Sequence, residues 1–227
     1  MATFVLVHGG FTGGWFWRPV ARRLRGRGHE VYTPTLTGFG ERVHLASPDV
    51  GLATHVEDVV NVLRYEDLHD VVLVGKSYAG MVITGVAERV PDRLTHLVFL
   101  EAAVPRDGEA LVNLLDPVVV AQLEAAAQAA GDGWRVPVPQ PPLDPRLTPL
   151  PLRPALEPVV VKHPAAAALP RTFIAATQRG EAGVMAAIAR SARRARAAGW
   201  RYAEVPTGHE PEQDAPDDVA RLLLEVA

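Results

Sequence analysis

The run Val71-Val-Leu-Val-Gly-Lys-Ser-Tyr-Ala-Gly80 decides the fold prediction for this chain. Its first four residues are all apolar, which is typical of a strand buried on both faces of a parallel sheet. A helical pattern begins near Met81, so Ser77 is predicted to lie on a sharp strand-to-helix turn that raises its hydroxyl above the sheet edge. Such a turn needs small residues two positions to either side, and Gly75 and Ala79 stand there. We therefore predict that Ser77 is a nucleophile; the simpler alternative is a serine that caps the helix.

Two main-chain amides are candidates for stabilising a negatively charged oxygen beside Ser77. The first N–H of the new helix belongs to Tyr78 and would point at this oxygen. The second would come from Gly10, in the glycine-rich turn His8-Gly-Gly-Phe11 after the first strand. Taken alone, that turn is more typical of an ordinary strand end. Its combination with the serine turn favours an oxyanion hole.

His209 is the predicted general base. It follows the last strand candidate in Val205-Pro-Thr-Gly-His209, and the order serine, acid, histidine is the one that this architecture uses. A serine hydroxyl is a weak nucleophile at neutral pH, so its proton must pass to a base. His55 and His69 are predicted to flank a surface helix, and His8 belongs to the glycine turn. The alternative for His209 is a solvent-exposed loop histidine.

Short apolar runs alternate with helical patterns along most of the chain. Thr54 and Glu57 are predicted to form a capping box at the start of one helix. The repeated strand–helix order predicts an α/β fold, with a mostly parallel sheet of about six strands and helices on both faces. The strand candidates are Thr3–Val7, Glu30–Thr33, Val71–Gly75, Thr95–Leu100, Thr172–Ala176 and Arg201–Val205.

Residues 105–170 interrupt this alternation because prolines crowd there, and proline cannot donate to a sheet ladder. One helix is predicted within the segment, at Val118–Ala130. We interpret the segment as a small cap inserted between the two parts of one core, residues 1–104 and 171–227. A disordered linker is the simpler alternative.

Composition excludes several classes of protein. The chain has 227 residues, of which 48% are hydrophobic and 22% charged, as in ordinary globular domains. The net charge of −3 argues against a nucleic-acid binder, and the lack of cysteine excludes thiolate metal sites and a cysteine nucleophile. No histidine–carboxylate cluster has metal-ligand spacing, so we expect no metal. No run is long and apolar enough to span a bilayer, and no basic leader precedes the first strand, so we expect no membrane contact and a cytoplasmic location.

Motifs over nearly the whole chain resemble those of the α/β-hydrolases: Phe4-Val-Leu-Val-His-Gly-Gly10, Gly14-Trp-Phe-Trp17, Pro34-Thr-Leu-Thr-Gly-Phe-Gly40, the serine turn and Thr207-Gly-His209. The chain is most similar to small bacterial relatives of plant methylesterases and hydroxynitrile lyases. The resemblance implies a serine-dependent, esterase-like mechanism without a cofactor. It also implies a compact cap over an apolar pocket, and homodimers are common among such proteins. We expect Phe11 and Trp15 to line this pocket.

The chain departs from the family pattern at three places. Bacterial relatives usually have His before the serine and Gly two residues after it, where this chain has Lys76 and Ala79. They also tend to have aspartate at the end of the next strand, where this chain has Glu101. The plant enzymes have the acid that orients the histidine near Glu181. Glu101 is the first candidate for that acid, Glu181 the second and a missing acid the third. If Glu101 pairs with Lys76 to hold a buried charge, it is structural instead.

The sequence predicts a serine-dependent carboxylic-ester hydrolase that forms an acyl-enzyme with a small or medium apolar ester. Two alternatives stay open: a lyase or secondary-metabolite cyclase on the same Ser77 and His209 frame, and a ligand-binding homologue that has lost turnover. A hydroxynitrile lyase is disfavoured. Plant lyases have Thr after the first-strand His and Lys after the catalytic His, where this chain has Gly9 and Glu210.

Overall fold

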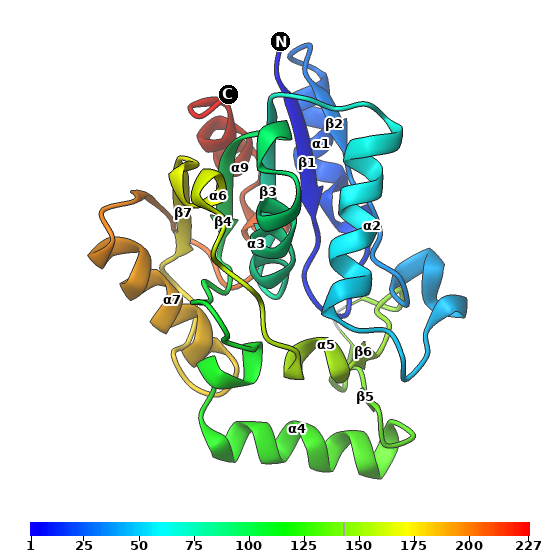
Figure 1. Cartoon of the computed structure of the whole chain (residues 1–227). Helices are drawn as coiled ribbons and strands as arrows, with labels where there is room; N and C mark the ends of the chain where they lie inside the picture. The colour runs from blue at the N-terminus through cyan, green and yellow to red at the C-terminus, as the bar shows by residue number, and fades with distance from the viewer. Residues whose placement is uncertain (143) are drawn as a thin grey trace.

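A six-stranded parallel sheet forms the centre of the computed structural model, which describes residues 1–142 and 144–227 (Figure 1). All neighbouring strands in it are parallel, so their carboxyl ends meet at one edge. In spatial order the strands are β2 (Glu30–Tyr32), β1 (Thr3–Val7), β3 (Val71–Lys76), β4 (Leu94–Leu100), β7 (Arg171–Ala176) and β8 (Arg201–Val205).

Helices cover both faces of this sheet. One face is covered by α1 (Arg18–Arg25) and α9 (Pro216–Leu224). The other is covered by α2 (Leu52–Tyr65), α3 (Ala79–Arg89) and α7 (Met185–Ala197) (Figure 1). Short elements connect them: η1 (Gly14–Trp17), η2 (Gly40–Leu45), η3 (Pro91–Arg93) and α8 (Pro211–Asp214).

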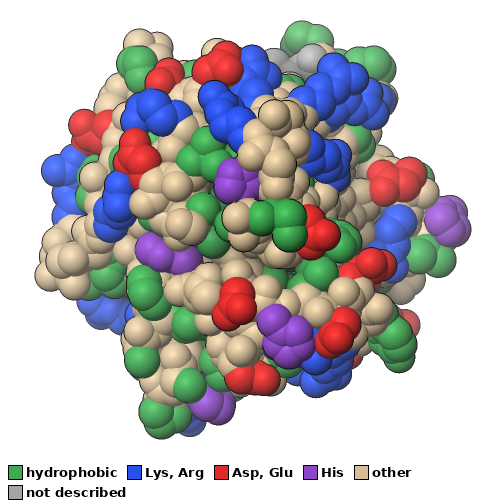
Figure 2. Space-filling view, turned by 90° about the horizontal axis from the view of Figure 1, so that it is seen from above, with side chains coloured by type: hydrophobic (Ala, Val, Ile, Leu, Met, Phe, Trp, Pro, Cys, Tyr) green, Lys and Arg blue, Asp and Glu red, His purple; other side chains and the backbone are tan. Residues whose placement is uncertain are grey.

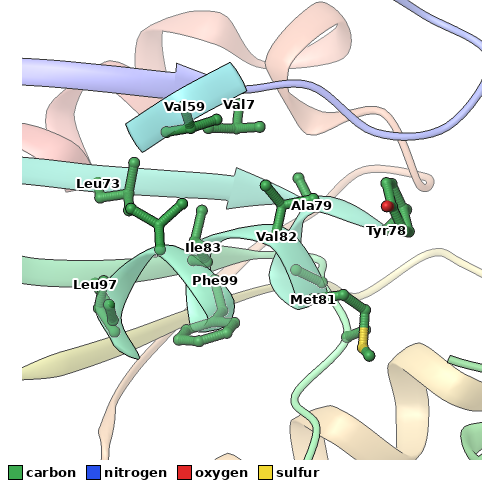
Figure 3. Packing of buried hydrophobic residues seen from close by; sticks show 14 of the residues in the cluster. Val7, Val59, Leu73, Tyr78, Ala79, Met81, Val82, Ile83, Leu97 and Phe99 are labelled. Carbon is green, nitrogen blue, oxygen red and sulfur yellow. The ribbon is translucent and has the colours of Figure 1, made fainter. Parts of the chain in front are cut away.

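The continuous apolar run of β3 is explained by these two layers. Val72 and Val74 belong to the core cluster on the side of α1 and α9. Val71 and Leu73 belong to the cluster on the side of α2 and α3, where Figure 3 shows Leu73 near Ile83. Because successive side chains of a strand point to opposite faces, a strand covered on both sides must be apolar at every position.

The segment 105–170 has two parts with different positions. The first part contains η4 (Leu111–Leu114), α4 (Pro117–Ala130), the antiparallel pair β5 (Arg135–Val136) and β6 (Leu150–Pro151), and α5 (Arg153–Leu156). These elements lie beyond the carboxyl edge of the sheet (Figure 1). The last element, α6 (Pro164–Ala168), lies instead near η3, which precedes β4, toward the opposite end of the sheet. The division of the chain into core and cap at these boundaries stays a prediction.

Several element boundaries differ from the sequence-based expectations. The helix α2 begins at Leu52 and not after Thr54; Gly51 is its N-cap, and the Thr54 hydroxyl accepts the Gly51 N–H at 3.4 Å. Glu57 pairs with Arg89 at 2.6 Å, so the predicted capping box is wrong. The glycine cap permits the same helix start without a side-chain oxygen at the cap position.

The surface carries both signs of charge. On the side of the molecule where the two chain ends lie, Figure 2 shows arginine and lysine side chains interspersed with aspartate and glutamate. This view agrees with the small net charge of −3. The helices among the described residues include none long and apolar enough to cross a membrane.

Candidate active site

Ser77 lies on the turn between β3 and α3 with its backbone in the left-handed region, at φ 54°. A serine in this region is strained, and such strain persists only where the surrounding structure holds it. Here the Ser77 N–H donates to the Leu100 carbonyl at 3.3 Å. The Ser77 carbonyl accepts the N–H of Gly80 at 3.2 Å and that of Ala103 at 2.9 Å. The end of β4 and the first turn of α3 therefore hold the turn from two sides.

Two glycines allow this turn to close. A Cβ on Gly75 would lie 2.7 Å from the Ala79 carbonyl oxygen, and a Cβ on Gly80 would lie 1.9 Å from the Ala103 carbonyl oxygen. Neither position accepts a side chain unless the backbone moves. Ala79 is itself fully buried, so its methyl group, where relatives usually have glycine, fits within the core.

His209 reaches Ser77 from the loop after β8. Its Nε2 lies 3.0 Å from the Ser77 Oγ, although 132 positions separate the two residues in the chain. Burial, followed by the charge of Lys76, lowers the pKa of His209 from 6.5 to about 3. The imidazole is therefore neutral at physiological pH, with Nε2 free to accept the serine proton and the other proton on Nδ1.

Glu101 is the carboxylate that the fold brings to His209. It follows β4, is fully buried and also has a left-handed backbone, at φ 47°. Its Oε1 lies 3.6 Å from His209 Nδ1 and 2.6 Å from the Nε of Arg179, and its Oε2 accepts the Ala176 N–H at 2.8 Å. Glu181, the second candidate, lies at the surface with 66% of its side chain exposed, 3.8 Å from Arg193.

The expected ion pair between Lys76 and Glu101 is wrong. The Lys76 ammonium contacts Glu210, the residue after His209, and lies 3.8 Å from Glu212. Burial lowers the pKa of Lys76, but the two carboxylates outweigh it and raise the pKa above the usual value, so the lysine is charged. The missed partners, Glu210 and Glu212, stand next to the base in the sequence, and β3 gives no signal of them.

Gly10 and Tyr78, the predicted oxyanion donors, both line one cavity with Ser77 and His209. The glycine turn is held by His8, whose Nε2 accepts the Leu36 N–H at 3.0 Å. Its Nδ1 therefore carries the proton and donates to the Gly9 carbonyl at 2.7 Å. Burial lowers the pKa of His8 to about 3, so this histidine is neutral.

His55 is buried and not at the helix surface, which corrects the sequence-based expectation. Its Nε2 donates to the Thr37 carbonyl at 3.0 Å, so its Nδ1 accepts the hydroxyl of Tyr78 at 2.8 Å. Thr37 is fixed in turn by Asp58, whose carboxylate accepts its N–H at 2.7 Å and its hydroxyl at 2.8 Å. The side chain of the residue after Ser77 is thus anchored to α2.

The cavity above Ser77 has a volume of about 570 Å³. Phe11 and Phe16 line it, whereas Trp15 is not among its described lining residues. Trp15 lies under the guanidinium of Arg146, 3.8 Å from the ring centroid. Most of the remaining lining is apolar and comes from residues 105–170 and α7, including Leu111, Leu115, Leu123, Leu150, Met185 and Ile188. The described residues contain no cluster of three histidines or carboxylates suited to a metal ion.

Comparison with known proteins agrees with this architecture. A model described as "Alpha/beta hydrolase family" matches residues 4–222, so the chain belongs to this family. This match and the solved structures described next confirm the predicted resemblance and fold class.

Three relatives illustrate the similarity. Carbendazim hydrolyzing esterase of Nocardioides sp. (strain SG-4G) is 50% identical over 125 residues, which cover 55% of this chain and 52% of that protein. Methylesterase 1 of Arabidopsis thaliana is 32% identical over 104 residues, 45% of this chain and 40% of that protein. The match thus spans about half of these curated relatives or less. An extracellular α/β-hydrolase from a Paenibacillus species, whose structure is described as homologous in structure and function to tobacco salicylic acid binding protein 2, has a TM-score of 0.85 at 25% identity, covering 100% of this chain and 99% of its own.

Proposed function

We propose that this protein is a serine-dependent carboxylic-ester hydrolase that acts through an acyl-enzyme. One observation carries the proposal: the 3.0 Å contact between Ser77 Oγ and the Nε2 of His209, at the base of a largely apolar cavity. A neutral, buried imidazole within hydrogen-bond distance of a strained serine is the arrangement that activates a hydroxyl for acyl transfer.

The reaction would proceed in two halves. Ser77 Oγ attacks the ester carbonyl while its proton passes to His209 Nε2, and the carbonyl oxygen becomes an oxyanion facing the N–H groups of Gly10 and Tyr78. The C–O bond to the alcohol then breaks, and the alcohol leaves with the proton from His209. Water attacks the acyl-enzyme after giving a proton to His209, and the free acid and the Ser77 hydroxyl are regenerated.

Glu101 is the proposed acid of this triad. The Nδ1–H of His209 faces its Oε1 at 3.6 Å, slightly longer than a hydrogen bond. Such contacts are often long in a resting site and shorten when the imidazole becomes charged. Glu181 is not proposed, because it lies exposed beside Arg193.

The proposed substrates are small or medium esters with an apolar acyl or alcohol part. The apolar lining and the volume of about 570 Å³ favour them. The relative from Nocardioides is named as a carbendazim-hydrolysing esterase, so carbendazim belongs in the substrate panel beside p-nitrophenyl acetate, butyrate and octanoate.

Covalent labelling tests the nucleophile. A fluorophosphonate probe should modify Ser77 at one site, which peptide mass spectrometry identifies, and Ser77→Ala should abolish both labelling and hydrolysis. Ser47→Ala, which changes a serine that only accepts a loop N–H, is the matched control and should behave as the parent protein. Hydrolysis that survives Ser77→Ala would refute the proposal. Labelling without turnover on the whole panel would favour the lyase or cyclase alternative, and ligand binding without labelling would favour a non-catalytic homologue.

A further inference from the structure

We infer that Arg179 is a positioning residue that keeps the Glu101 carboxylate ionised and within reach of His209. This inference rests on the proposed function, because it concerns the acid of the same site. Arg179 lies in the loop after β7, and 9% of its side chain is exposed. Neither its position nor its type was singled out by the sequence motifs.

The contacts of Arg179 are specific. Its Nε lies 2.6 Å from Glu101 Oε1, and its Nη1 donates to the Ala176 carbonyl at 3.0 Å. The N–H of the same Ala176 donates to the other carboxylate oxygen, Oε2, at 2.8 Å. One residue of β7 therefore aligns both the carboxylate and the guanidinium, which fixes the direction in which Oε1 points.

Glu101 needs this cation because it is fully buried. Burial is the main influence on the pKa of Glu101 and raises it, while the Ala176 N–H, Arg179 and then Lys76 lower it. Lys76 is the other cation near this carboxylate among the described residues, but its ammonium is in contact with Glu210 and near Glu212. Arg179 is thus the cation in direct contact with Glu101, and a buried carboxylate without such a partner takes up a proton instead.

Arg179 and His209 face the same oxygen. Neither Glu101 Oε1, Arg179 Nε nor His209 Nδ1 has a well-aligned hydrogen bond within the described part of the chain. The oxygen is therefore placed between two donors and committed to neither. When His209 takes the serine proton and becomes a cation, its Nδ1–H gains attraction for Oε1. Arg179 holds the carboxylate ready for this step without binding both of its oxygens.

The test compares the neutral variant Arg179→Gln with the charge-retaining Arg179→Lys. Removal of an adjacent opposite charge raises the pKa of a carboxyl by about one to three units, so the acidic limb of the kcat/KM profile should move to higher pH by about that amount in Arg179→Gln. At pH 6 the rate should fall at least about tenfold, and it should recover at alkaline pH. Arg179→Lys should keep the limb close to that of the parent protein.

A second variant separates Glu101 from His209. Arg179 also lowers the pKa of His209, so its removal raises the limb through both groups. In a Glu101→Gln background, where no carboxyl titrates, adding Arg179→Gln should move the limb much less than it does in the parent. Arg193→Gln, at a surface arginine 66% exposed, is the matched control and should change nothing.

The outcomes are distinct. An unchanged acidic limb in folded Arg179→Gln, with a normal thermal unfolding curve, overturns the inference; so does a faster rate at neutral pH, which would mean that Arg179 withholds Glu101 from the base. An equal limb shift in the parent and Glu101→Gln backgrounds also overturns it. Fluorophosphonate labelling of Ser77 is measured in every variant. Absent labelling in the parent protein would be a failure of the proposed function and not of the role of Arg179.

Discussion

Replacing Lys76 by methionine tests the charge arrangement behind Ser77, because methionine keeps the side-chain length and removes the charge. The side chain of Lys76 is 4% exposed, and those of its partners Glu210 and Glu212 are 28% and 1% exposed. At 3.8 Å and an effective dielectric constant of about 20, one such attraction is worth about 4 kcal/mol before desolvation. Removing one partner of a buried pair costs about 3–5 kcal/mol, and we expect a loss of this size in the free energy of unfolding at about pH 8.5.

The loss should shrink at acidic pH. Burial raises the pKa of Glu212, and the loss of Lys76 should raise it further. A carboxyl whose pKa is higher in the folded protein than in the unfolded chain destabilises the fold increasingly as the pH rises above its unfolded value. Near pH 5 the protonated carboxyl no longer needs a cation, so about half of the loss or more should be recovered.

Urea unfolding followed by tryptophan fluorescence at about pH 5, 7 and 8.5 measures this change. The double variant Lys76→Met with Glu212→Gln should be more stable at pH 8.5 than the single variant, because it buries one unpaired carboxylate fewer. Lys162→Met is the control, at a lysine whose side chain is 73% exposed. A loss below about 1 kcal/mol at pH 8.5, or a loss that is the same at all three pH values, would refute the reasoning.

Three further predictions concern the turn, the oxyanion side and the base. Gly80→Ala places a Cβ 1.9 Å from a carbonyl oxygen and should cost about 3 kcal/mol or prevent folding, whereas Gly208→Ala, with nothing within 4 Å, should unfold in urea like the parent. Tyr78→Phe leaves the buried His55 Nδ1 unpaired and should cost about 1–3 kcal/mol of stability, yet hydrolysis should persist because the oxyanion donor is a main-chain N–H; a hundredfold loss of kcat in folded protein would contradict this. The pKa of His209 is lowered to about 3, so this base is neutral above that pH and kcat/KM should be level between about pH 6 and 8; a limb centred near 6.5 would show a solvated imidazole.

The sheet and the serine turn are predictable because their signals are local. Four apolar residues before Gly75 require cover on both faces, and the small residues around Ser77 are needed within a few positions of the chain. His209 was identified from chain order, and the structure places it 3.0 Å from Ser77. The same local reasoning placed the helix start at Thr54, two residues late, because a glycine cap leaves little pattern.

Partners of buried charges were not predictable in this way. Lys76 was expected to pair with Glu101 because the two strands are neighbours, but a lysine side chain is long enough to choose among several carboxylates. Arg179 was overlooked, since a lone arginine in a loop is usually solvated. Only the packed structure shows which cation reaches the buried carboxylate.

The register of the sheet explains how Glu101 can serve where relatives use an acid from a later strand. Lys76 of β3 is level with Leu100 of β4, so the next residues, Ser77 and Glu101, leave the sheet at the same height. Both adopt a left-handed backbone, at φ 54° and 47°, which turns each side chain off its strand at the same edge. The loop after β8 lies across this edge and brings His209 to both of them. Because the carboxyl ends of parallel strands are aligned, an acid on β4 reaches the imidazole without any change in the sheet, and the loop after β7 is free to supply a cation instead.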